Sequence, residues 1–440
     1  MKLKIKSVSQ VKGVVKAPPS KSYTHRAVIL ASLSKGTSIL KDPLSSEDTI
    51  ASRETCEKFG ANINSYDNYW EVEGTAGNLQ IESDEAIDLK NSGTTLRIMA
   101  SIAALANNKI IFTGDDSLKT RPMKPLLDSL KDLGVEIKSI NNNDKVPIEI
   151  SPGFKGGVSE IIGNISSQYI SSMLISGPLT KLGIEVKIKG KLSSKPYIDM
   201  TRDIMSKFSV KSTCESLTKH KECKNDSKKC ISHIFRVEPQ KYIATDYVIE
   251  GDYSSASYLL GAVAIYGGEI TVKNLFKDSK QGDKLIIDVL KCMGVKITVK
   301  YDSVTLKSDG ILKGVNINLQ EAPDLLPTIA VLGALANGET NIYGVEHGRF
   351  KETDRIATSC EELAKLGVNI QENPDGLKII GGVTSGTVTS HKDHRLAMAL
   401  SLIGLKHDVV VEDGEVFDIS FPNFIEAMGE IGINFQLFSY

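Results

Sequence analysis

The sequence predicts an α/β protein of two domains, each built from three copies of a unit with two helices and four strands. Two observations lead to this prediction. The chain has 440 residues, whereas a single hydrophobic core stops growing near about 250–300 residues, so more than one domain is expected. In addition, one short pattern returns along the chain, in which a helical segment ends in glycine and an alternating apolar segment then begins.

The repeated pattern marks the junction between a helix and the strand that follows it. Its copies are Phe59-Gly60-Ala61-Asn62-Ile63, Leu133-Gly134-Val135-Glu136-Ile137, Met293-Gly294-Val295-Lys296-Ile297, Leu366-Gly367-Val368-Asn369-Ile370 and Ile431-Gly432-Ile433-Asn434-Phe435, with a weaker copy at Phe208-Ser209-Val210-Lys211. A single such junction is common in α/β proteins. Six copies at intervals of about 65–85 residues indicate a duplicated unit. Three units in each domain is the simplest partition.

Apolar helices are expected after four short loops of small, hydroxyl-bearing or charged residues. These loops are residues 18–26, 91–97, 321–324 and 392–395. Backbone N–H groups at a helix start face whatever lies there, and the helix dipole favours an anion at that end. Cations and hydroxyl groups recur at these helix starts, which predicts a site that gathers several of them around a highly anionic ligand.

The first half of the chain offers mainly hydroxyl groups and isolated cations. Lys21, Ser22 and Arg26 follow two prolines and predict an anion-binding mouth at the start of a helix. Arg121 lies at a loop-to-helix junction, and hydroxyl clusters occur within residues 166–168 and 193–197. Each segment taken alone is equally well explained as a helix cap or a turn.

The second half is richer in ionisable groups. Asp324 immediately precedes an apolar helix, whose dipole would help to keep the carboxylate ionised and able to act as a base. Lys351 and Arg355 have the i, i+4 spacing of one helical face, with Glu352 beside them. In isolation that segment is typical of a solvated, salt-bridged turn. The segment 392–395 adds a further cationic cluster before an apolar helix.

Composition excludes some classes of partner. The 53 Lys and Arg residues nearly balance the 54 Asp and Glu residues, so the molecule lacks the strong positive field that binds nucleic acid or an anionic membrane. The start of the chain has no apolar signal region, and no later stretch reaches the roughly 20 apolar residues of a membrane span. We therefore expect a cytoplasmic protein, and its scattered cysteines are expected to be reduced thiols.

A polar run of residues, 211–229, predicts an exposed insertion, because it has too little apolar content to offset its ordering entropy by burial. A zinc site is the alternative interpretation of its surroundings. The potential ligands are Cys214, His220, Cys223, Cys230 and His233. Their spacing lacks the paired cysteines of structural zinc sites, so no metal site is predicted.

The motifs taken together closely resemble those of the 5-enolpyruvylshikimate-3-phosphate (EPSP) synthase family. The resemblance runs from the SKSYTHR stretch, residues 20–26, to the SFPNF stretch, residues 420–424, and includes the segments 250–256 and 281–283. About nine motifs in the same order carry it. The resemblance implies the enolpyruvyl transferase fold, in which each of two domains is an inside-out barrel of three βαβαββ repeats. It places residues 20–249 in one domain and residues 1–19 with 250–440 in the other.

The resemblance also implies the reaction. In this family the 5-hydroxyl group of shikimate 3-phosphate attacks C2 of phosphoenolpyruvate, and the tetrahedral adduct then loses phosphate, without a metal or organic cofactor. Asp324 is expected to take the proton of the hydroxyl group. Glu352 and Lys21 are expected to protonate the methylene carbon and later to deprotonate it, because acidic groups in different environments can divide acid and base roles.

The resemblance assigns ligand contacts to residues in both halves of the chain. For shikimate 3-phosphate they are Lys21, Ser22, Arg26, Ser166, Ser167, Gln168, Ser194, Tyr197, Asp324, His347 and Lys351. For phosphoenolpyruvate they are Lys21, Asn91, Gly93, Thr94, Arg121, Gln168, Arg355 and Arg395. Since both halves contribute, we expect a monomer whose halves close over the two small molecules.

Two positions depart from the family pattern. Ile419 stands where a lysine often contacts phosphoenolpyruvate, and His347 aligns near an asparagine that contacts shikimate 3-phosphate. A charged hydrogen bond of the first kind contributes about 1.5–3 kcal/mol. Weaker binding of phosphoenolpyruvate is therefore expected unless a nearby lysine compensates.

Three other functions compete with this interpretation. Enolpyruvyl transfer to UDP-N-acetylglucosamine uses the same fold and donor, but the serine-rich segments and the KETDR segment, residues 351–355, favour shikimate 3-phosphate. An RNA 3′-phosphate cyclase-like protein is disfavoured by the balanced charge. A catalytically inactive metabolite-binding module is disfavoured because Lys21, Asp324 and Glu352 are all present.

Overall fold

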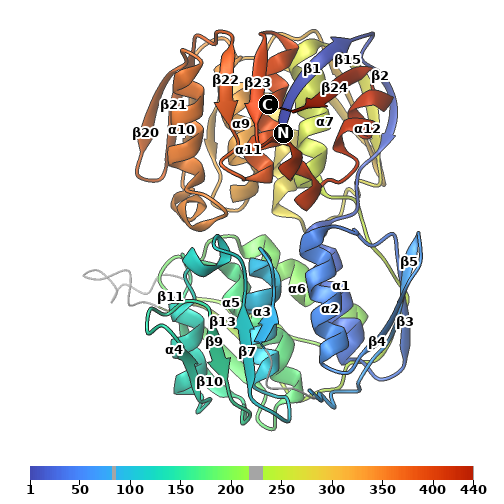
Figure 1. Ribbon diagram of the computed structural model, residues 1–440, viewed down its shortest axis with the longest axis vertical. Coiled ribbons are helices and arrows are strands. Elements are labelled where there is room, and N and C mark those ends of the chain that lie inside the picture. The colour runs from blue at the N-terminus through green and yellow to red at the C-terminus, as the bar shows by residue number, and fades with distance from the viewer. Residues whose placement is uncertain (82–85, 218–230, 440) are drawn as a thin grey trace. The chain divides into compact units, whose positions relative to one another are not determined.

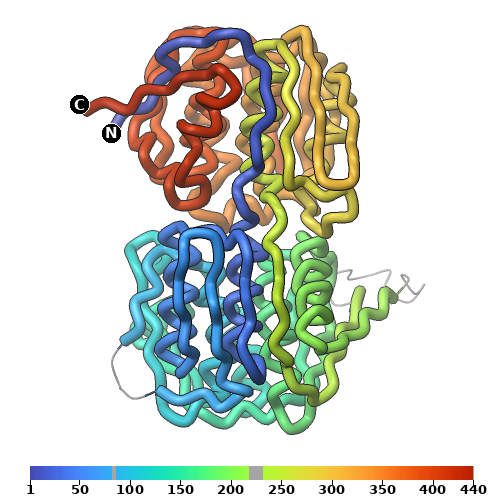
Figure 2. The backbone as a smooth tube through the Cα atoms, turned by 90° about the vertical axis from the view of Figure 1, so that its right-hand side faces the viewer, coloured from blue at the N-terminus to red at the C-terminus, as the bar shows by residue number. Residues whose placement is uncertain are grey.

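The computed structural model describes residues 1–81, 86–217 and 231–439. The chain divides into two compact units (Figures 1 and 2). The N-terminal unit is Lys21–Ile249, and the C-terminal unit combines Met1–Ser20 with Glu250–Tyr440. Each unit has its own apolar core.

The helices alternate between two kinds, and six lie in each unit. The N-terminal unit contains α1 (Lys21–Leu33), α2 (Glu47–Lys58), α3 (Gly93–Ala103), α4 (Lys124–Asp132), α5 (Ser167–Ser176) and α6 (Lys195–Lys207). The C-terminal unit contains α7 (Tyr253–Tyr266), α8 (Ile286–Cys292), α9 (Leu326–Ala334), α10 (Arg355–Lys365), α11 (His394–Ser401) and α12 (Phe424–Glu430). These counts cover only the residues that the structure describes.

The described strands of the N-terminal unit form three four-stranded sheets, ordered β14-β3-β5-β4, β6-β7-β9-β8 and β10-β11-β13-β12. The strands are β3 (Thr37–Lys41), β4 (Asn62–Ser65), β5 (Tyr69–Glu73), β6 (Ala86–Asp88), β7 (Ile110–Thr113), β8 (Ile137–Ser139), β9 (Ile148–Ile150), β10 (Gly157–Ile162), β11 (Ile184–Lys189), β12 (Thr213–Ser216), β13 (Ile231–Val237) and β14 (Tyr247–Val248).

The C-terminal unit forms three sheets of the same kind, ordered β16-β17-β15-β2, β18-β19-β21-β20 and β22-β23-β1-β24. The strands are β1 (Lys2–Val8), β2 (Lys12–Lys16), β15 (Gly268–Lys273), β16 (Lys296–Val299), β17 (Ser303–Ser308), β18 (Asn316–Asn318), β19 (Thr340–Tyr343), β20 (Asn369–Asn373), β21 (Gly376–Gly381), β22 (Gly386–Thr389), β23 (Val409–Glu412) and β24 (Ile433–Phe438). Two of its sheets therefore take a strand from the start of the chain, drawn in blue in Figure 2.

Each sheet belongs to one repeat of the order β-α-β-α-β-β. In the repeat from β6 to β9, β6 pairs parallel with β7, and β9 pairs antiparallel with both β7 and β8. The other repeats follow this plan, and three of them are completed by β14, β1 or β2 from elsewhere in the chain. The predicted α/β fold of three βαβαββ repeats in each of two domains is confirmed.

The two kinds of helix explain the inside-out arrangement. The first helix of each repeat is almost wholly buried, as in α3, α5 and α9. The second helix buries only one face, as in α4 and α10. A helix that is apolar all round must be enclosed by other elements. The first helices consequently form the interior of each unit, with the sheets outside them (Figure 1).

The helix–strand junctions found in the sequence are the ends of the second helices. Gly60, Gly134, Gly294, Gly367 and Gly432 all have φ between 79° and 101°, and Ser209 has φ 68° at the weaker sixth junction. An added Cβ at Gly134 or Gly294 would meet nothing within 4 Å. The left-handed backbone, and not crowding, therefore explains glycine at those two positions.

The structure describes only the first part of the predicted insertion, residues 211–217. Its first residues form β12, an edge strand that pairs antiparallel with β13, because ladder hydrogen bonds and one packed face suffice to order a polar edge strand. The rest of the insertion, including His220, Cys223 and Cys230, lies outside the described residues. Cys56, Cys214, Cys292 and Cys360 are free thiols. Among the described helices, none combines the length and the apolar composition of a membrane span.

Candidate functional site

Most of the predicted site residues lie at or just before helix N-termini. They form two clusters, one in each unit. The N-terminal cluster belongs to the starts of α1, α3, α5 and α6, and the C-terminal cluster to the starts of α9, α10 and α11. The first residues of a helix have backbone N–H groups without intrahelical partners. Both clusters therefore have donors and helix dipoles suited to anions.

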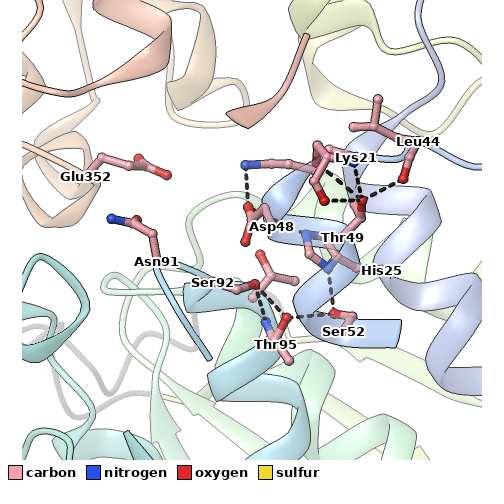
Figure 3. Close-up of polar contacts among 12 residues, drawn as sticks. Lys21, His25, Leu44, Asp48, Thr49, Ser52, Asn91, Ser92, Thr95 and Glu352 are labelled. Atoms are coloured by element: carbon pink, nitrogen blue, oxygen red, sulfur yellow. Dashed lines mark hydrogen bonds and ion pairs between the residues drawn. The ribbon is translucent and has the colours of Figure 1, made fainter. Parts of the chain in front are cut away.

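Lys21, the first residue of α1, forms an ion pair that the sequence did not predict. Its Nζ lies 2.9 Å from Oδ2 of Asp48 at the start of α2 (Figure 3), and both side chains are about nine-tenths buried. Burial by itself would raise the pKa of Asp48, but Lys21, His25 and Ser92 together hold it well below its usual value. Asp48 is therefore a permanent counter-ion for Lys21.

The starts of α3 and α5 are joined by side-chain hydrogen bonds. Gln168 Nε2 donates to Thr94 Oγ1 at 2.9 Å, and Gln168 Oε1 accepts from Nη1 of Arg97 at 2.7 Å. Arg121 donates to the side chain of Asn91. A Cβ at Gly93 would lie only 2.6 Å from Nη1 of Arg121, so a side chain there would displace that guanidinium group. These predicted phosphoenolpyruvate residues therefore lie together, and Arg97 is an additional cation among them.

The predicted phosphate-binding serines lie on two adjacent loops. Ser193 N donates to Gly163 O at 3.0 Å, which joins the loop before α6 to the loop before α5. Ser166 caps α5, accepting from Gln168 N at 3.3 Å. Ser194 caps α6 with a left-handed backbone, φ 56°. Hydroxyl groups and backbone donors are thus concentrated at two neighbouring helix starts, a favourable arrangement for a phosphate group.

Arg26 is enclosed in the N-terminal unit without a carboxylate partner among the described residues. Its Nε donates to Thr201 Oγ1 at 2.7 Å, Nη1 to Ser22 O at 2.9 Å and Nη2 to Tyr197 O at 3.3 Å. Burial lowers its pKa to about 10, and the nearby tyrosines Tyr197 and Tyr23 offset this only in part. A buried cation that lacks a negative partner favours the binding of an anion.

In the C-terminal cluster three cations surround one carboxylate. Oδ1 of Asp324 lies 2.7 Å from Arg355 Nη1 and 3.3 Å from Lys351 Nζ. Its Oδ2 lies 2.9 Å from Arg395 Nη2. Glu352 Oε2 contacts Nη2 of Arg355 at 2.6 Å. The predicted catalytic carboxylates therefore lie together, bridged by Arg355.

Arg355 is the centre of this cluster and is fully buried. It also donates from Nε to Asp393 at 2.8 Å. Burial lowers the pKa of Arg355, but Asp393, Glu352 and Asp324 outweigh burial and the net shift is upward. In the same way, Arg355 outweighs the burial of Asp393, whose pKa is lowered. Arg355 and Asp393 thus each keep the other charged.

Sequence reasoning did not single out Asp393 or Asp283 as site residues. Asp393 caps α11 by accepting from Arg395 N at 2.9 Å, so it orients both arginines of the cluster. Asp283 accepts a hydrogen bond from Ser254. Burial and then the charge of Asp324 raise its pKa to about 6, against the opposing effect of Arg395. The sequence did contain a signal for Asp393, because this residue lies directly before a helix and close to Arg395.

The remaining predicted residue of the C-terminal unit, His347, is buried in the 3₁₀ helix Glu346–Phe350, just before Lys351. Ile419 ends the 3₁₀ helix Gly414–Ile419 and is partly buried. The predicted weakening of phosphoenolpyruvate binding at Ile419 stays a prediction.

One group of metal-type ligands lies together in the described residues, namely Glu361, Glu362 and His391. Lys365 interacts with both glutamates, with Nζ 2.9 Å from Glu361 and 2.7 Å from Glu362. Glu362 also accepts from Thr389 N at 2.9 Å. The ammonium group of Lys365 already forms ion pairs with both carboxylates, so the arrangement is explained as an ion-pair network.

Comparison with known proteins decides the family. The EPSP synthase (3-phosphoshikimate 1-carboxyvinyltransferase) family model matches residues 5–428. A 3-phosphoshikimate 1-carboxyvinyltransferase of Methanobrevibacter smithii is 58% identical over 437 residues, which cover 99% of this chain and 100% of the relative. The chain belongs to the EPSP synthase family.

Further relatives agree with this assignment. A 3-phosphoshikimate 1-carboxyvinyltransferase of Methanothermobacter thermautotrophicus is 51% identical over 437 residues, with 99% of this chain and 100% of the relative covered. A solved EPSP synthase of Acinetobacter baumannii superposes with a TM-score of 0.81 at 24% identity, with both chains covered completely. That likeness supports the fold. The family assignment resolves the alternatives in favour of EPSP synthase over the other enolpyruvyl transferases and the cyclase-like proteins.

Proposed function

We propose that this chain uses the two clusters to transfer the enolpyruvyl group of phosphoenolpyruvate to the 5-hydroxyl group of shikimate 3-phosphate. The reaction follows from membership of the family over residues 5–428 and from the named relatives. The chain is accordingly a transferase of the shikimate pathway, which leads to aromatic amino acids. What we add is an assignment of its residues to steps, which rests on their geometry.

The observation that carries the assignment is the set of three cations around Asp324. In the described structure this carboxylate contacts Lys351, Arg355 and Arg395. Phosphoenolpyruvate brings a carboxylate and a phosphate, and guanidinium groups bind both kinds of anion in pairs. Its anionic groups compete with Asp324 for Arg355 and Arg395. Binding of the donor thus loosens the carboxylate that has to accept a proton.

The proton transfers then follow from the roles of the carboxylates. Asp324 takes the proton of the 5-hydroxyl group while the hydroxyl oxygen forms a bond to C2 of phosphoenolpyruvate. The methylene carbon takes a proton from Glu352 or Lys21, which gives the tetrahedral adduct. The same carbon then returns a proton as the C–O bond to phosphate breaks. Asp324 gives the proton that it took from the hydroxyl group to the departing phosphate, so the products are the enolpyruvyl ether and inorganic phosphate, with atoms and charges balanced.

The N-terminal cluster is proposed to hold the acceptor. Ser166, Ser167 and Ser194 lie at the starts of α5 and α6 and suit the 3-phosphate group. Arg26 and Ser22 suit the ring carboxylate, which would supply the negative charge that Arg26 lacks. Lys351 is assigned to the same phosphate, and Tyr197 to the ring.

The decisive experiment measures phosphate released from phosphoenolpyruvate, with and without shikimate 3-phosphate. Asp324→Asn should lower kcat by about 10²–10⁴-fold while changing substrate affinity much less. Glu321→Gln, which removes a charge three residues earlier, is the matched control and should stay near the wild-type rate. Full turnover by Asp324→Asn would show that the assigned base is wrong.

A second variant tests the acid. Glu352→Gln keeps a hydrogen-bond acceptor for Arg355 but loses the transferable proton, so kcat should fall by roughly 10²-fold or more. Release of deuterium-labelled product in D₂O reports protonation of the methylene carbon. Undiminished label in Glu352→Gln would assign that proton to another group.

The predictions of a cytoplasmic monomer without a cofactor belong to the same proposal. Because its proposed ligands come from both units, the radius of gyration should decrease when shikimate 3-phosphate and phosphoenolpyruvate are added. Small-angle scattering measures this, and light scattering gives the mass. An unchanged radius at saturating ligand would argue against closure.

A further inference from the structure

We propose that His25 is a positioning residue for Lys21, acting through Asp48 and a buried chain of hydroxyl groups. The proposal rests on the role of Lys21 in the proposed function. It concerns only contacts within the N-terminal unit, where α1, α2 and α3 begin side by side. His25 is completely buried and is not a predicted ligand of either substrate.

The starts of α1 and α2 face each other with matched spacing. Lys21 and His25 are four residues apart on α1, and Asp48 and Ser52 are four residues apart on α2, so each pair lies on one helical face. Lys21 Nζ lies 2.9 Å from Asp48 Oδ2, and His25 Nδ1 lies 2.7 Å from Ser52 Oγ (Figure 3). His25 Nε2 is 3.6 Å from the same Oδ2 atom. Lys21 and His25 therefore converge on one carboxylate oxygen.

The hydrogen bonds continue from His25 to α3. Ser52 Oγ lies 2.6 Å from Thr95 Oγ1, and Thr95 Oγ1 lies 2.5 Å from Ser92 Oγ (Figure 3). Ser92 caps α3 and immediately precedes Gly93. The chain thus connects Lys21 with the loop proposed to bind phosphoenolpyruvate. Every member from His25 to Ser92 is buried.

The contacts of His25 with Ser52 and Asp48 favour one tautomer of its ring. A proton on Nδ1 alone would turn the lone pair of Nε2 toward the carboxylate of Asp48, which is repulsive. With the proton on Nε2, that N–H faces Asp48 and Nδ1 accepts from Ser52. Thr95 then donates to Ser52, and Ser92 donates to Thr95, so every contact of the chain contains one proton. This arrangement gives each hydroxyl contact one proton and turns the Nε2–H of the imidazole toward Asp48 Oδ2, 3.6 Å away.

The surroundings of His25 favour the neutral ring. Burial is the largest effect and lowers its pKa, Asp48 opposes this, and the charges of Lys21 and Arg26 lower it further. The groups that face it from α3 are uncharged hydroxyls. A neutral ring with the proton on Nε2 directs that N–H toward Asp48, 3.6 Å away, without adding a second positive charge beside Lys21. His25 consequently stabilises Asp48, the counter-ion of Lys21, and adds no positive charge that would repel Lys21.

The tautomer can be measured without any assay of activity. Nitrogen-15 NMR of the histidine-labelled full-length protein, with His25→Gln used for assignment, should show His25 neutral and protonated at Nε2 from about pH 6 to 8. The other tautomer, or a titration with a midpoint near the ordinary value of 6.5, would overturn the proposal.

The kinetic test compares two substitutions of His25. His25→Phe removes both contacts and should lower kcat roughly ten-fold, with a smaller change in KM. The pH profile of kcat should also change, because Asp48, the ion-pair partner of Lys21, is then held less firmly. His25→Gln can again direct an N–H toward Asp48 and should restore most of the rate and the profile.

The controls separate this role from a loss of folding and from a wrong function. Ser32→Ala removes a buried hydroxyl of α1 that donates to Val28 O at 2.7 Å and is not part of the His25 chain, and it should leave the profile unchanged. If His25→Phe kept the wild-type profile, or if His25→Gln failed to restore it, the positioning role would be wrong. A wild-type protein that releases no phosphate would instead refute the proposed function, and the NMR result would still stand by itself.

Discussion

The two units neutralise their buried cations in different ways. In the C-terminal unit Arg355 contacts the three carboxylates of Asp324, Glu352 and Asp393. In the N-terminal unit Arg26 is equally buried, but its described partners are a hydroxyl group and two carbonyl oxygens. Arg355 therefore has anionic partners within the protein, whereas we propose that Arg26 gains its anionic partner from a ligand.

This difference indicates how the two regions contribute to the reaction. In the proposed function, a cluster that already contains its own anions exchanges them when phosphoenolpyruvate binds, and this exchange would release Asp324 to act as the base. A buried cation without an anion instead binds a carboxylate with little rearrangement. The C-terminal unit is thus suited to chemistry, and the N-terminal unit to holding the acceptor.

The largest expected effect is the loss of Arg355. Arg355→Met should destabilise the C-terminal unit by about 3–5 kcal/mol, because buried carboxylates lose their common partner. Arg26→Met is the matched variant and should cost only about 1–2 kcal/mol, since it removes neutral hydrogen bonds. Urea unfolding followed in both variants measures the difference. Equal losses would show that the two regions are not electrostatically distinct.

Binding of shikimate 3-phosphate provides a second test of the role of Arg26. Shikimate 3-phosphate should raise the unfolding temperature of the wild type, because a ligand that binds only the folded state stabilises it. The increase should be largely absent in Arg26→Met. Thermal unfolding at several ligand concentrations tests this. An unchanged increase would remove Arg26 from the binding site.

The next effect concerns the pH dependence of stability. Asp283 has an ordinary pKa of 3.8 and a folded pKa of about 6, so the folded protein binds more protons between these values. Its contribution to stability therefore falls as pH rises through this range. Asp283→Asn should abolish that fall and stabilise the protein at pH 7 by roughly 1–3 kcal/mol.

Asp393 should behave in the opposite way. Its pKa is lowered by folding, so its stabilising contribution is present above its ordinary value of 3.8 and is lost as pH falls below it. Unfolding measured from pH 3 to 8 in the wild type, Asp283→Asn and the exposed control Asp302→Asn separates the two contributions. A similar pH dependence in Asp283→Asn and the wild type would contradict the first assignment.

The smallest expected effect is in the hydroxyl chain of the N-terminal unit. Ser52→Ala should destabilise that unit by about 1 kcal/mol, because His25 and Thr95 each lose a neutral hydrogen bond. Thr55→Ala is the control one turn later, where the hydroxyl bonds only to Ala51 O in the same helix. Denaturant unfolding of both variants measures the difference in stability. Equal losses in Ser52→Ala and Thr55→Ala would show that the hydroxyl chain does not stabilise the unit.

Much of the architecture followed from the sequence alone. The recurrence of glycine after a helix fixed the number and type of repeats, because a left-handed residue at a helix end is a local requirement of the backbone. The loops before apolar helices likewise identified where Lys21, Asp324 and Arg355 would lie. Both signals are contained within a few consecutive residues, so they can be read without knowledge of the fold.

The partners of those residues were decided by tertiary structure. Asp48 lies 27 residues from Lys21, and Thr201 lies 175 residues from Arg26. No local pattern connects such pairs, and the sequence gives no sign that Arg26 is enclosed or that His25 faces a carboxylate. Burial determines whether a charge needs a partner, and burial depends on how distant segments pack. The sequence thus determined which groups are present, and packing determined which of them stabilise one another.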